Sequence, residues 1–69
     1  MRMTRIVSDA VRAVGYDPAG RVLRVQFHSG DSYDYFDVDP DLYARMLQPH
    51  PWREVGQQVL HHRFRQHYD

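Results

Sequence analysis

The side chains best suited to chemistry in this sequence are a group of histidines near the C-terminus. His61, His62 and His67 lie close together in the sequence, and His50 precedes a proline. Zinc sites need three or four ligands, and their usual signatures are cysteine pairs or a His-Glu-x-x-His helix, neither of which occurs here. A solvated tail whose charge depends on pH accounts for these histidines. We therefore predict no metal site.

Hydroxyl and carboxyl groups are present, but their spacing matches no catalytic or calcium-binding pattern. Ser8, Ser29 and Ser32 have no neighbouring motif that would activate a hydroxyl as a nucleophile. Five aspartates fall in one stretch without the spacing of a calcium loop: Asp31, Asp34, Asp37, Asp39 and Asp41. Turn formation, edge protection and helix capping account for them. We predict no catalytic residue, no cofactor and a protein that is not an enzyme.

Arginine is the remaining candidate for binding chemistry. Every basic residue other than histidine is an arginine, and its planar side chain suits bidentate contacts with phosphate or carboxylate. A coding bias toward arginine explains the same composition without function. The formal net charge is zero, which argues against strong nonspecific binding to nucleic acid. The charge is nevertheless uneven, because an acidic band at residues 29–41 separates two basic ends.

Length and composition limit the architecture. A chain of 69 residues can form one small domain, which buries about 60% of the surface exposed by its unfolded chain. The sequence has no cysteine, which fits a reducing compartment. Its charged start and the lack of a long apolar stretch predict neither a signal peptide nor a membrane span. We expect a cytoplasmic protein that does not contact membranes.

Two turns divide the first half of the chain into three predicted strands. Asp17-Pro18-Ala19-Gly20 fits a turn in which proline presets φ and glycine takes the left-handed conformation. His28-Ser29-Gly30 marks the second turn. Strand-like patterns run from Ala10 to Tyr16, from Arg21 to His28 and from Asp31 to Val38. Because short turns join them, we predict a three-stranded antiparallel meander over residues 10–38.

The register of the two hairpins decides which side chains face the core. With three-residue loops closed by a glycine bulge, Asp17 pairs with Arg21 and Phe27 with Asp31. One face then carries Val11, Ala13 and Gly15, next to Leu23, Val25 and Phe27, next to Tyr33 and Tyr35. A two-residue turn at Ser29-Gly30 would instead turn both tyrosines outward and bury Asp34 without a partner, which is costly. We favour the three-residue loops.

The second half of the chain reads as helical. Asp39-Pro40-Asp41 is typical of a helix start, with an N-cap carboxylate and proline in the first turn. Two apolar stripes at helical spacing predict two short helices: Tyr43, Met46 and Leu47, then Trp52, Val55 and Val59. Gly56 weakens the second helix by about 1 kcal/mol relative to alanine. We expect both helices to cover the aromatic face of the sheet.

These elements predict one α+β domain, a meander followed by two helices packed on one sheet face. We divide it into an N-terminal arm (1–7), the meander (10–38), a helical part (39–62) and a tail (63–69). Phe64 and Tyr68 are the tail residues that could return to the core. A short fourth strand near Phe64 is also considered.

A set of positions along the chain resembles the KTSC domain family. These positions are Val7-Ser8, Val11, Gly15-Tyr16-Asp17, Leu23, Val25, Phe27, Gly30, Tyr33-Asp34-Tyr35, Val38, Pro40, Tyr43 and Leu47. The Tyr-x-Tyr pair and the Gly-Tyr-Asp turn are the most distinctive of them, and the whole set covers about two-thirds of the chain. After Leu47 the sequence departs from the family pattern, which usually continues with a Ser-x-Gly element and an asparagine.

The resemblance implies a function as well as a fold. The family occurs alone in bacterial proteins and at the C-terminus of some lysyl-tRNA synthetases, which implies a small noncatalytic binding module with RNA or tRNA as its partner. The family-motif residues, which we interpret as structural, are Gly15, Tyr16, Asp17, Gly30, Tyr33 and Tyr35.

Two surfaces of the predicted sheet are candidates for binding RNA. Tyr33 and Tyr35 could stack unpaired bases, as aromatic residues do on many RNA-binding sheets, but the favoured register places them in the core. The opposite sheet face would combine cations with an aromatic ring, as single-strand binders do. We predict that the nucleic-acid-binding residues are Arg12, Arg24, Gln26 and Tyr16.

An apolar contact is the alternative. In the predicted register Val14, Tyr16 and Val22 form an exposed patch, and the sheet has free edges. The alternative function is therefore a protein-interaction or self-association module. Salt separates the two hypotheses, because phosphate contacts weaken steeply as salt rises and apolar contacts do not.

Overall fold

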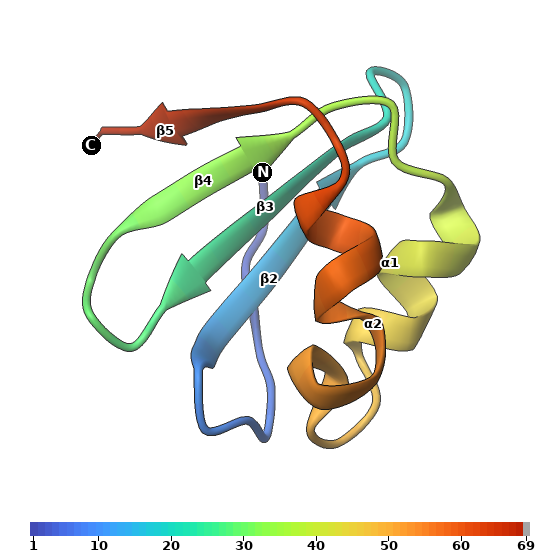
Figure 1. Cartoon of the computed structure of the whole chain (residues 1–69). Helices are drawn as coiled ribbons and strands as arrows, with labels where there is room; N and C mark the ends of the chain where they lie inside the picture. The colour runs from blue at the N-terminus through green and yellow to red at the C-terminus, as the bar shows by residue number, and fades with distance from the viewer. Residues whose placement is uncertain (69) are drawn as a thin grey trace.

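The computed structural model describes residues 1–68 as a five-stranded sheet and two helices (Figure 1). The strands are β1 (Thr4–Arg5), β2 (Val11–Asp17), β3 (Val22–Phe27), β4 (Ser32–Tyr35) and β5 (Phe64–His67), and the helices are α1 (Pro40–Met46) and α2 (Pro51–Leu60). The strands lie in sequence order, and each is antiparallel to the next. The predicted α+β fold is confirmed, with β5 at the position considered for a further strand.

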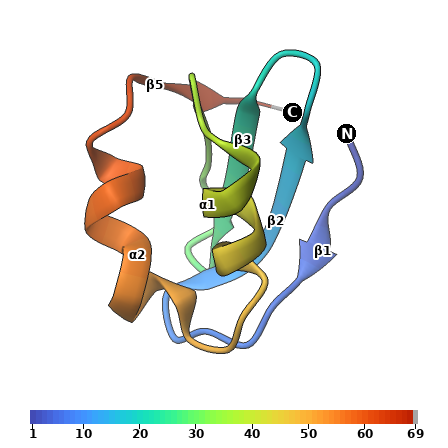
Figure 2. The same ribbon diagram turned by 90° about the vertical axis from the view of Figure 1, so that its right-hand side faces the viewer.

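Both helices lie against the same side of the sheet, as the two views show (Figures 1 and 2). We call this side the core face and the opposite side, over which no described helix lies, the open face. Four buried helix residues belong to the same hydrophobic cluster as the buried residues of the central strands: Leu42, Met46, Val55 and Val59. Within the described chain, neither helix is long and apolar enough to cross a membrane.

The hairpin between β3 and β4 has the predicted register. The Phe27 amide donates to the Asp31 carbonyl at 2.9 Å, and the Gly30 amide donates back to Phe27 at 2.9 Å. Gly30 has φ of 102°, the left-handed region that glycine adopts without strain. Val25 therefore pairs with Tyr33, and the next core-face pair joins Leu23 and Tyr35.

The hairpin between β2 and β3 differs from the prediction, which was wrong about its register. Asp17 pairs with Val22 rather than with Arg21, and Arg21, not Gly20, takes a positive φ of 56°. The loop is one residue longer than expected, so every following pair shifts by one. Because side chains alternate along a strand, this shift turns β2 over. Val14 and Tyr16 thereby move from the predicted outer patch to the core face, and Val14 is fully buried.

An irregularity in β2 returns Val11 to the core as well. The register shifts between Val11 and Ala13, so that Val11 pairs with Phe27 while Ala13 pairs with Gln26. An extra residue of this kind is a β-bulge. Val11 and Val14 both have 0% exposure, and the bulge turns Arg12 and Ala13 between them away from the helices.

Aromatic side chains fill the space between sheet and helices. The Tyr16 hydroxyl donates to the Val38 carbonyl, and its ring stacks on Tyr43 with centroids 5.0 Å apart. Trp52 of α2 meets the ring of Phe27 edge-on at 5.2 Å. Gly56 makes this possible, because a Cβ at that position would lie 3.1 Å from the Trp52 ring. The glycine that weakens α2 therefore lets the indole pack across it.

The helix ends and the tail depart in detail from the sequence prediction. Asp39 is the N-cap of α1, but its carboxylate makes no capping hydrogen bond and instead forms an ion pair with Arg21. Leu42 and Met46 are the buried residues of α1, whereas Leu47, the C-cap residue, is 41% exposed. Phe64 and Tyr68 stay exposed, although the Phe64 ring contacts that of Tyr33 at 5.8 Å.

We expect Gly15→Ala to detach the N-terminal arm from the open face. A Cβ at Gly15 would lie 2.8 Å from the backbone carbonyl of Arg2 and 2.7 Å from Met3 Sδ, so the arm would have to move. The free energy of unfolding in urea should fall by about 1–3 kcal/mol. Hydrogen exchange of the Ile6 amide, which donates to Arg12 across β1 and β2, should accelerate.

Gly20→Ala is the matched control for this prediction. Its Cβ would lie 2.9 Å from the flexible carboxylate of Asp17 and at an ordinary contact distance of 3.6 Å from Val22 Cγ2, so a smaller loss of stability and an unchanged Ile6 amide are expected. Equal effects of the two substitutions would contradict the role assigned to Gly15.

Candidate functional site

The open face collects cationic and polar side chains from all five strands. The register places Arg24 beside Asp34 and Asp34 beside Arg65, with Gln26, Ser32 and His67 forming the neighbouring row. Arg5 pairs with Ala13 at the other edge, next to the bulged Arg12. Five of the nine arginines thus belong to this face: Arg5, Arg12, Arg24, Arg63 and Arg65.

Arg63 belongs to this face through its contact with Phe36. Phe36 follows the core residue Tyr35, and its amide donates to the Arg63 carbonyl at 2.8 Å, which continues the pairing of β4 and β5. The Arg63 guanidinium lies over the Phe36 ring, 5.5 Å from its centroid. Such a cation–π contact holds the guanidinium near the face of the ring.

The centre of the open face is a mostly buried ion pair. Arg24 donates to both carboxylate oxygens of Asp34, at 2.7 and 3.0 Å. The two side chains are 23% and 10% exposed, respectively. The hydrogen bond from Arg24, reinforced by its charge and by the charges of His67 and Arg65, lowers the pKa of Asp34 although burial opposes this. Asp34 is therefore ionised and neutralises Arg24 in place.

The other arginines of this face lie toward its two edges. Arg5 and Arg12 are exposed beside β1 and β2, and Arg63 and Arg65 are exposed at β5. The Arg12 guanidinium reaches the carbonyl of His28 at 3.4 Å. Among residues 1–68, none of these four arginines takes part in an ion pair. Their charges are therefore available to an external anion.

The structure brings together three of the four residues predicted to bind nucleic acid. Arg12, Arg24 and Gln26 share the open face, whereas Tyr16 lies on the core face against Tyr43. The prediction that Tyr16 joins them was wrong because the longer turn inverts the facing of β2. Sequence reasoning missed Arg63 and Arg65, although the alternation of Arg63, Arg65 and His67 is a strand-like signal.

Tyr33 and Tyr35 lie on the core face, as the favoured register predicted. Tyr35 is 3% exposed, and burial raises its pKa, with a smaller effect from Tyr33. Tyr33 is partly buried and packs edge-on against Phe27 at 6.0 Å. Neither ring is placed to stack a base on the open face.

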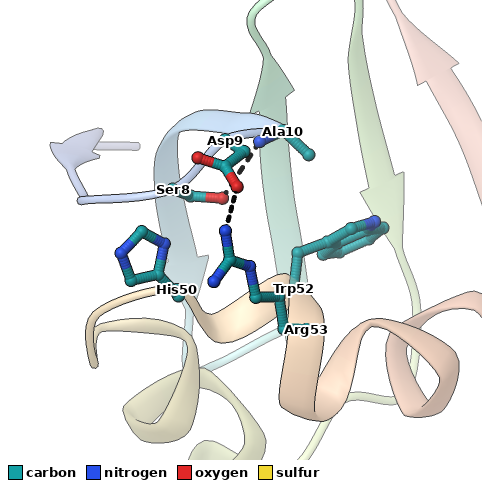
Figure 3. Close-up of a pocket in the computed structure, with 6 residues that line it drawn as sticks. All are labelled: Ser8, Asp9, Ala10, His50, Trp52 and Arg53. Carbon is teal, nitrogen blue, oxygen red and sulfur yellow. Dashed lines mark hydrogen bonds and ion pairs between the residues drawn. The ribbon is translucent and has the colours of Figure 1, made fainter.

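A small cavity lies between the loop before β2 and the start of α2. It has a volume of about 120 Å³ and is lined by Ser8, Asp9, Ala10, His50, Trp52 and Arg53 (Figure 3). His50 has φ of 52°, held by an amide hydrogen bond to the Val7 carbonyl and followed by Pro51, which disfavours a right-handed helical conformation at His50. Within the described chain its Nδ1 is buried without a hydrogen-bond partner.

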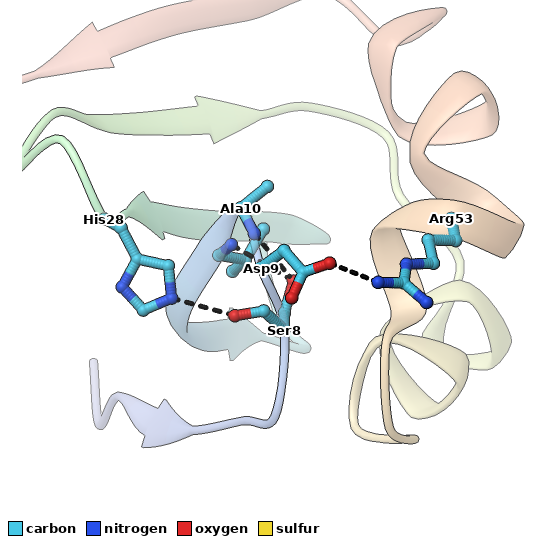
Figure 4. Close-up of polar contacts among 6 residues, drawn as sticks. Ser8, Asp9, Ala10, His28 and Arg53 are labelled. Carbon is cyan, nitrogen blue, oxygen red and sulfur yellow. Dashed lines mark hydrogen bonds and ion pairs between the residues drawn. The ribbon is translucent and has the colours of Figure 1, made fainter.

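The polar groups around this cavity hold the loop in place (Figure 4). The Ser8 hydroxyl accepts hydrogen bonds from the amides of Ala10 and Val11 at 3.2 and 3.1 Å. The Ser8 carbonyl lies 2.9 Å from His28 Nε2. Asp9 pairs with Arg53, which lowers the pKa of the Asp9 carboxyl through a hydrogen bond and through its charge. The contacts tie this loop to α2 and to the tip of the second hairpin.

The histidines of the C-terminal half do not gather in one place. His62 Nδ1 lies 2.9 Å from the Phe36 carbonyl, while His67 sits on the open face opposite Ser32. Across residues 1–68, no group of three or more histidine, aspartate or glutamate side chains could hold a metal ion.

Comparisons with known proteins agree on one family. Residues 7–50 match the KTSC domain family. The chain is 32% identical over 63 residues to a protein of Tsukamurella paurometabola, covering 91% of this chain and 94% of that protein. It is 35% identical over 48 residues to an uncharacterized protein of Stutzerimonas stutzeri, covering 70% and 68%. The fold is similar to the crystal structure of a KTSC domain protein from Yersinia pestis, with a TM-score of 0.87, 22% identity and 97% of each chain covered.

We expect Asp34→Asn to lower the free energy of unfolding by about 2–3 kcal/mol at pH 7, because the largely buried Arg24 would lose its bidentate, charge-assisted bond to the Asp34 carboxylate. Arg24 lowers the pKa of Asp34 in the folded state, so the pair stabilises fully above the unfolded value of about 3.9 and loses its effect as pH falls through the folded pKa. Urea unfolding should therefore show the difference shrinking in strong acid.

Asp39→Asn provides the control, because the Asp39 and Arg21 side chains are 72% and 51% exposed. Its cost should stay below about 1 kcal/mol. If the two substitutions were equally costly at pH 7, the central pair would not have the importance given to it here.

Proposed function

This chain belongs to the KTSC domain family, and on that basis we propose that it is a small noncatalytic binding module that binds RNA, such as tRNA, on its open face. The attachment of the family to some lysyl-tRNA synthetases supports an RNA partner. The charge distribution on the open face is the physical reason for the proposal.

The observation that supports this proposal is the uneven distribution of charge between the two sides of the sheet. The net charge of the chain is zero, yet five arginines belong to the open face. Among residues 1–68, the carboxylates that the register places there are Asp34, already paired with Arg24, and Asp17 at the end of β2. A surface of one sign can attract a polyanion even when the whole molecule is neutral. Arginine side chains also suit phosphate oxygens geometrically.

The Ser8 hydroxyl, the Asp9 carboxylate and the Arg53 guanidinium are engaged in structural contacts. This supports a noncatalytic role. The open face is built on strands and extends across the whole sheet, which suits a partner larger than a metabolite. Phosphate contacts to such a face would give affinity without reading sequence.

We expect labelled tRNA to bind the purified protein with strong salt dependence, measured by fluorescence anisotropy between about 50 and 200 mM salt. The double substitution Arg63→Gln and Arg65→Gln should weaken binding and reduce the slope of log affinity against log salt by about 2. Arg24 is unsuitable for this test, because removing it would leave Asp34 buried and unpaired.

The charge-matched control is the double substitution Arg45→Gln and Arg53→Gln, which removes two exposed arginines from the helices. It should leave both affinity and slope close to those of the unmodified protein. Equal losses in the two variants would mean that net charge, rather than the open face, governs binding. No saturable binding at the lower salt would refute the proposal.

One observation favours the alternative of a protein-interaction or self-association module. The predicted patch around Val14 does not exist, because Val14 is fully buried. In the described sheet, however, β5 is an edge strand, and Phe64 and Tyr68 beside it are 57% and 75% exposed. An edge strand flanked by exposed rings can pair with another chain. If RNA fails to bind, sedimentation of the protein and of a Phe64→Ser variant is the next measurement.

A further inference from the structure

We propose that the open face binds the backbone of double-stranded RNA rather than unpaired bases. This inference rests on the proposed function and names the class of RNA that the face fits. Two independent features carry it: the side of the sheet on which the aromatic rings lie, and the positions of the available cations.

The aromatic rings lie on the wrong side for base stacking. Proteins that bind single strands usually stack successive bases on exposed aromatic side chains along a basic groove. Here the ring contacts connect residues of the core face and of the helices: Tyr16 with Tyr43, Phe27 with Tyr33 and Trp52, and Phe64 with Tyr33 and Tyr35. Tyr68 bonds to Gln66, the partner of Tyr33 in the sheet.

Phe36 is the aromatic residue that the alternation of β4 places on the open side. Arg63 lies over its ring at 5.5 Å, so a base would have to displace the guanidinium to stack there. Within residues 1–68 the open face therefore offers no bare ring as a stacking platform. Its binding energy has to come from phosphate contacts.

The cations form two groups with a neutralised centre between them. Arg5 and Arg12 lie at the β1–β2 side, and Arg63 and Arg65 lie at the β5 side. With about 4.8 Å between neighbouring strands, the groups are about 14–19 Å apart across the sheet. The Arg24–Asp34 pair occupies the middle and contributes little net charge. A single strand following the centre would miss both groups.

A duplex presents the matching pattern, because its two backbones run on either side of a groove. The minor groove of an RNA helix is wide and shallow and displays 2′-hydroxyl groups. Gln26 and Ser32, which are partly exposed and pair with each other in the sheet, lie between the two cationic groups. Their short polar side chains could meet these hydroxyls while the arginines contact phosphates of both strands.

The test compares an RNA duplex of about 16 base pairs with each of its separate strands, labelled identically, by anisotropy at several salt concentrations. The duplex should bind at least about tenfold more tightly than either strand. Arg12→Gln and Arg65→Gln, one from each side, should each reduce the salt slope for the duplex by about 1. Arg45→Gln on α1 should leave it unchanged. Thermal unfolding followed by circular dichroism verifies that each variant is folded.

The outcomes separate this inference from the proposed function. Equal or tighter binding of the single strands would overturn the duplex inference and leave RNA binding standing. If the slope of log affinity against log salt changed only with Arg65→Gln, or only with Arg12→Gln, the inference that both cationic groups contact the duplex would be wrong. Binding of neither form would overturn the proposed function itself.

Discussion

One extra residue in β2 fixes which side chains enter the core from the first hairpin. Residues along a regular strand alternate between faces, so Val11 and Val14, an odd number apart, cannot both point inward without an irregularity. The bulge supplies it, and both valines are fully buried. The same bulge turns Arg12 outward and leaves the small Ala13 beside Arg5 of β1. The hydrophobic core and the cationic face thus depend on a single shift in pairing.

The sequence predicted the positions of the strands and helices better than it predicted which side chains of each strand point toward the core. For β3 and β4 the argument succeeded because one alternative would have buried Asp34 without a partner, a cost large enough to decide between registers. No such penalty distinguished the possible turns before β3. Gly20 suggested a three-residue loop, yet Arg21 adopts the left-handed conformation and the loop gains a residue. The bulge then shifts the pairing back by one residue, so Val11 points inward both in the predicted register and in the observed one.

The candidate site was predictable only in part for the same reason. Arg12, Arg24 and Gln26 were assigned to the correct face, but Tyr16 changed sides with the register. Arg24 lies on the face where it was expected. Its bidentate bond to Asp34 makes it part of a structural ion pair, which could not be predicted from the residue types alone. Arg63 and Arg65 required β5, whose polar sequence lacks the apolar alternation of β3. The match to the KTSC domain covers residues 7–50 and ends before that strand.

The order of the strands has a consequence for how the chain folds. β1 to β4 pair with their sequence neighbours through short loops, and such local contacts form quickly because little chain entropy is lost in closing them. Pairing of β5 with β4 has to close a much longer loop, because both helices lie between the two strands in the sequence. The last strand would then be the last to close and the first to open. Arg65 in β5 and Arg63 just before it would reach the open face only in the completed domain, which would make the cationic surface a property of the fully folded state.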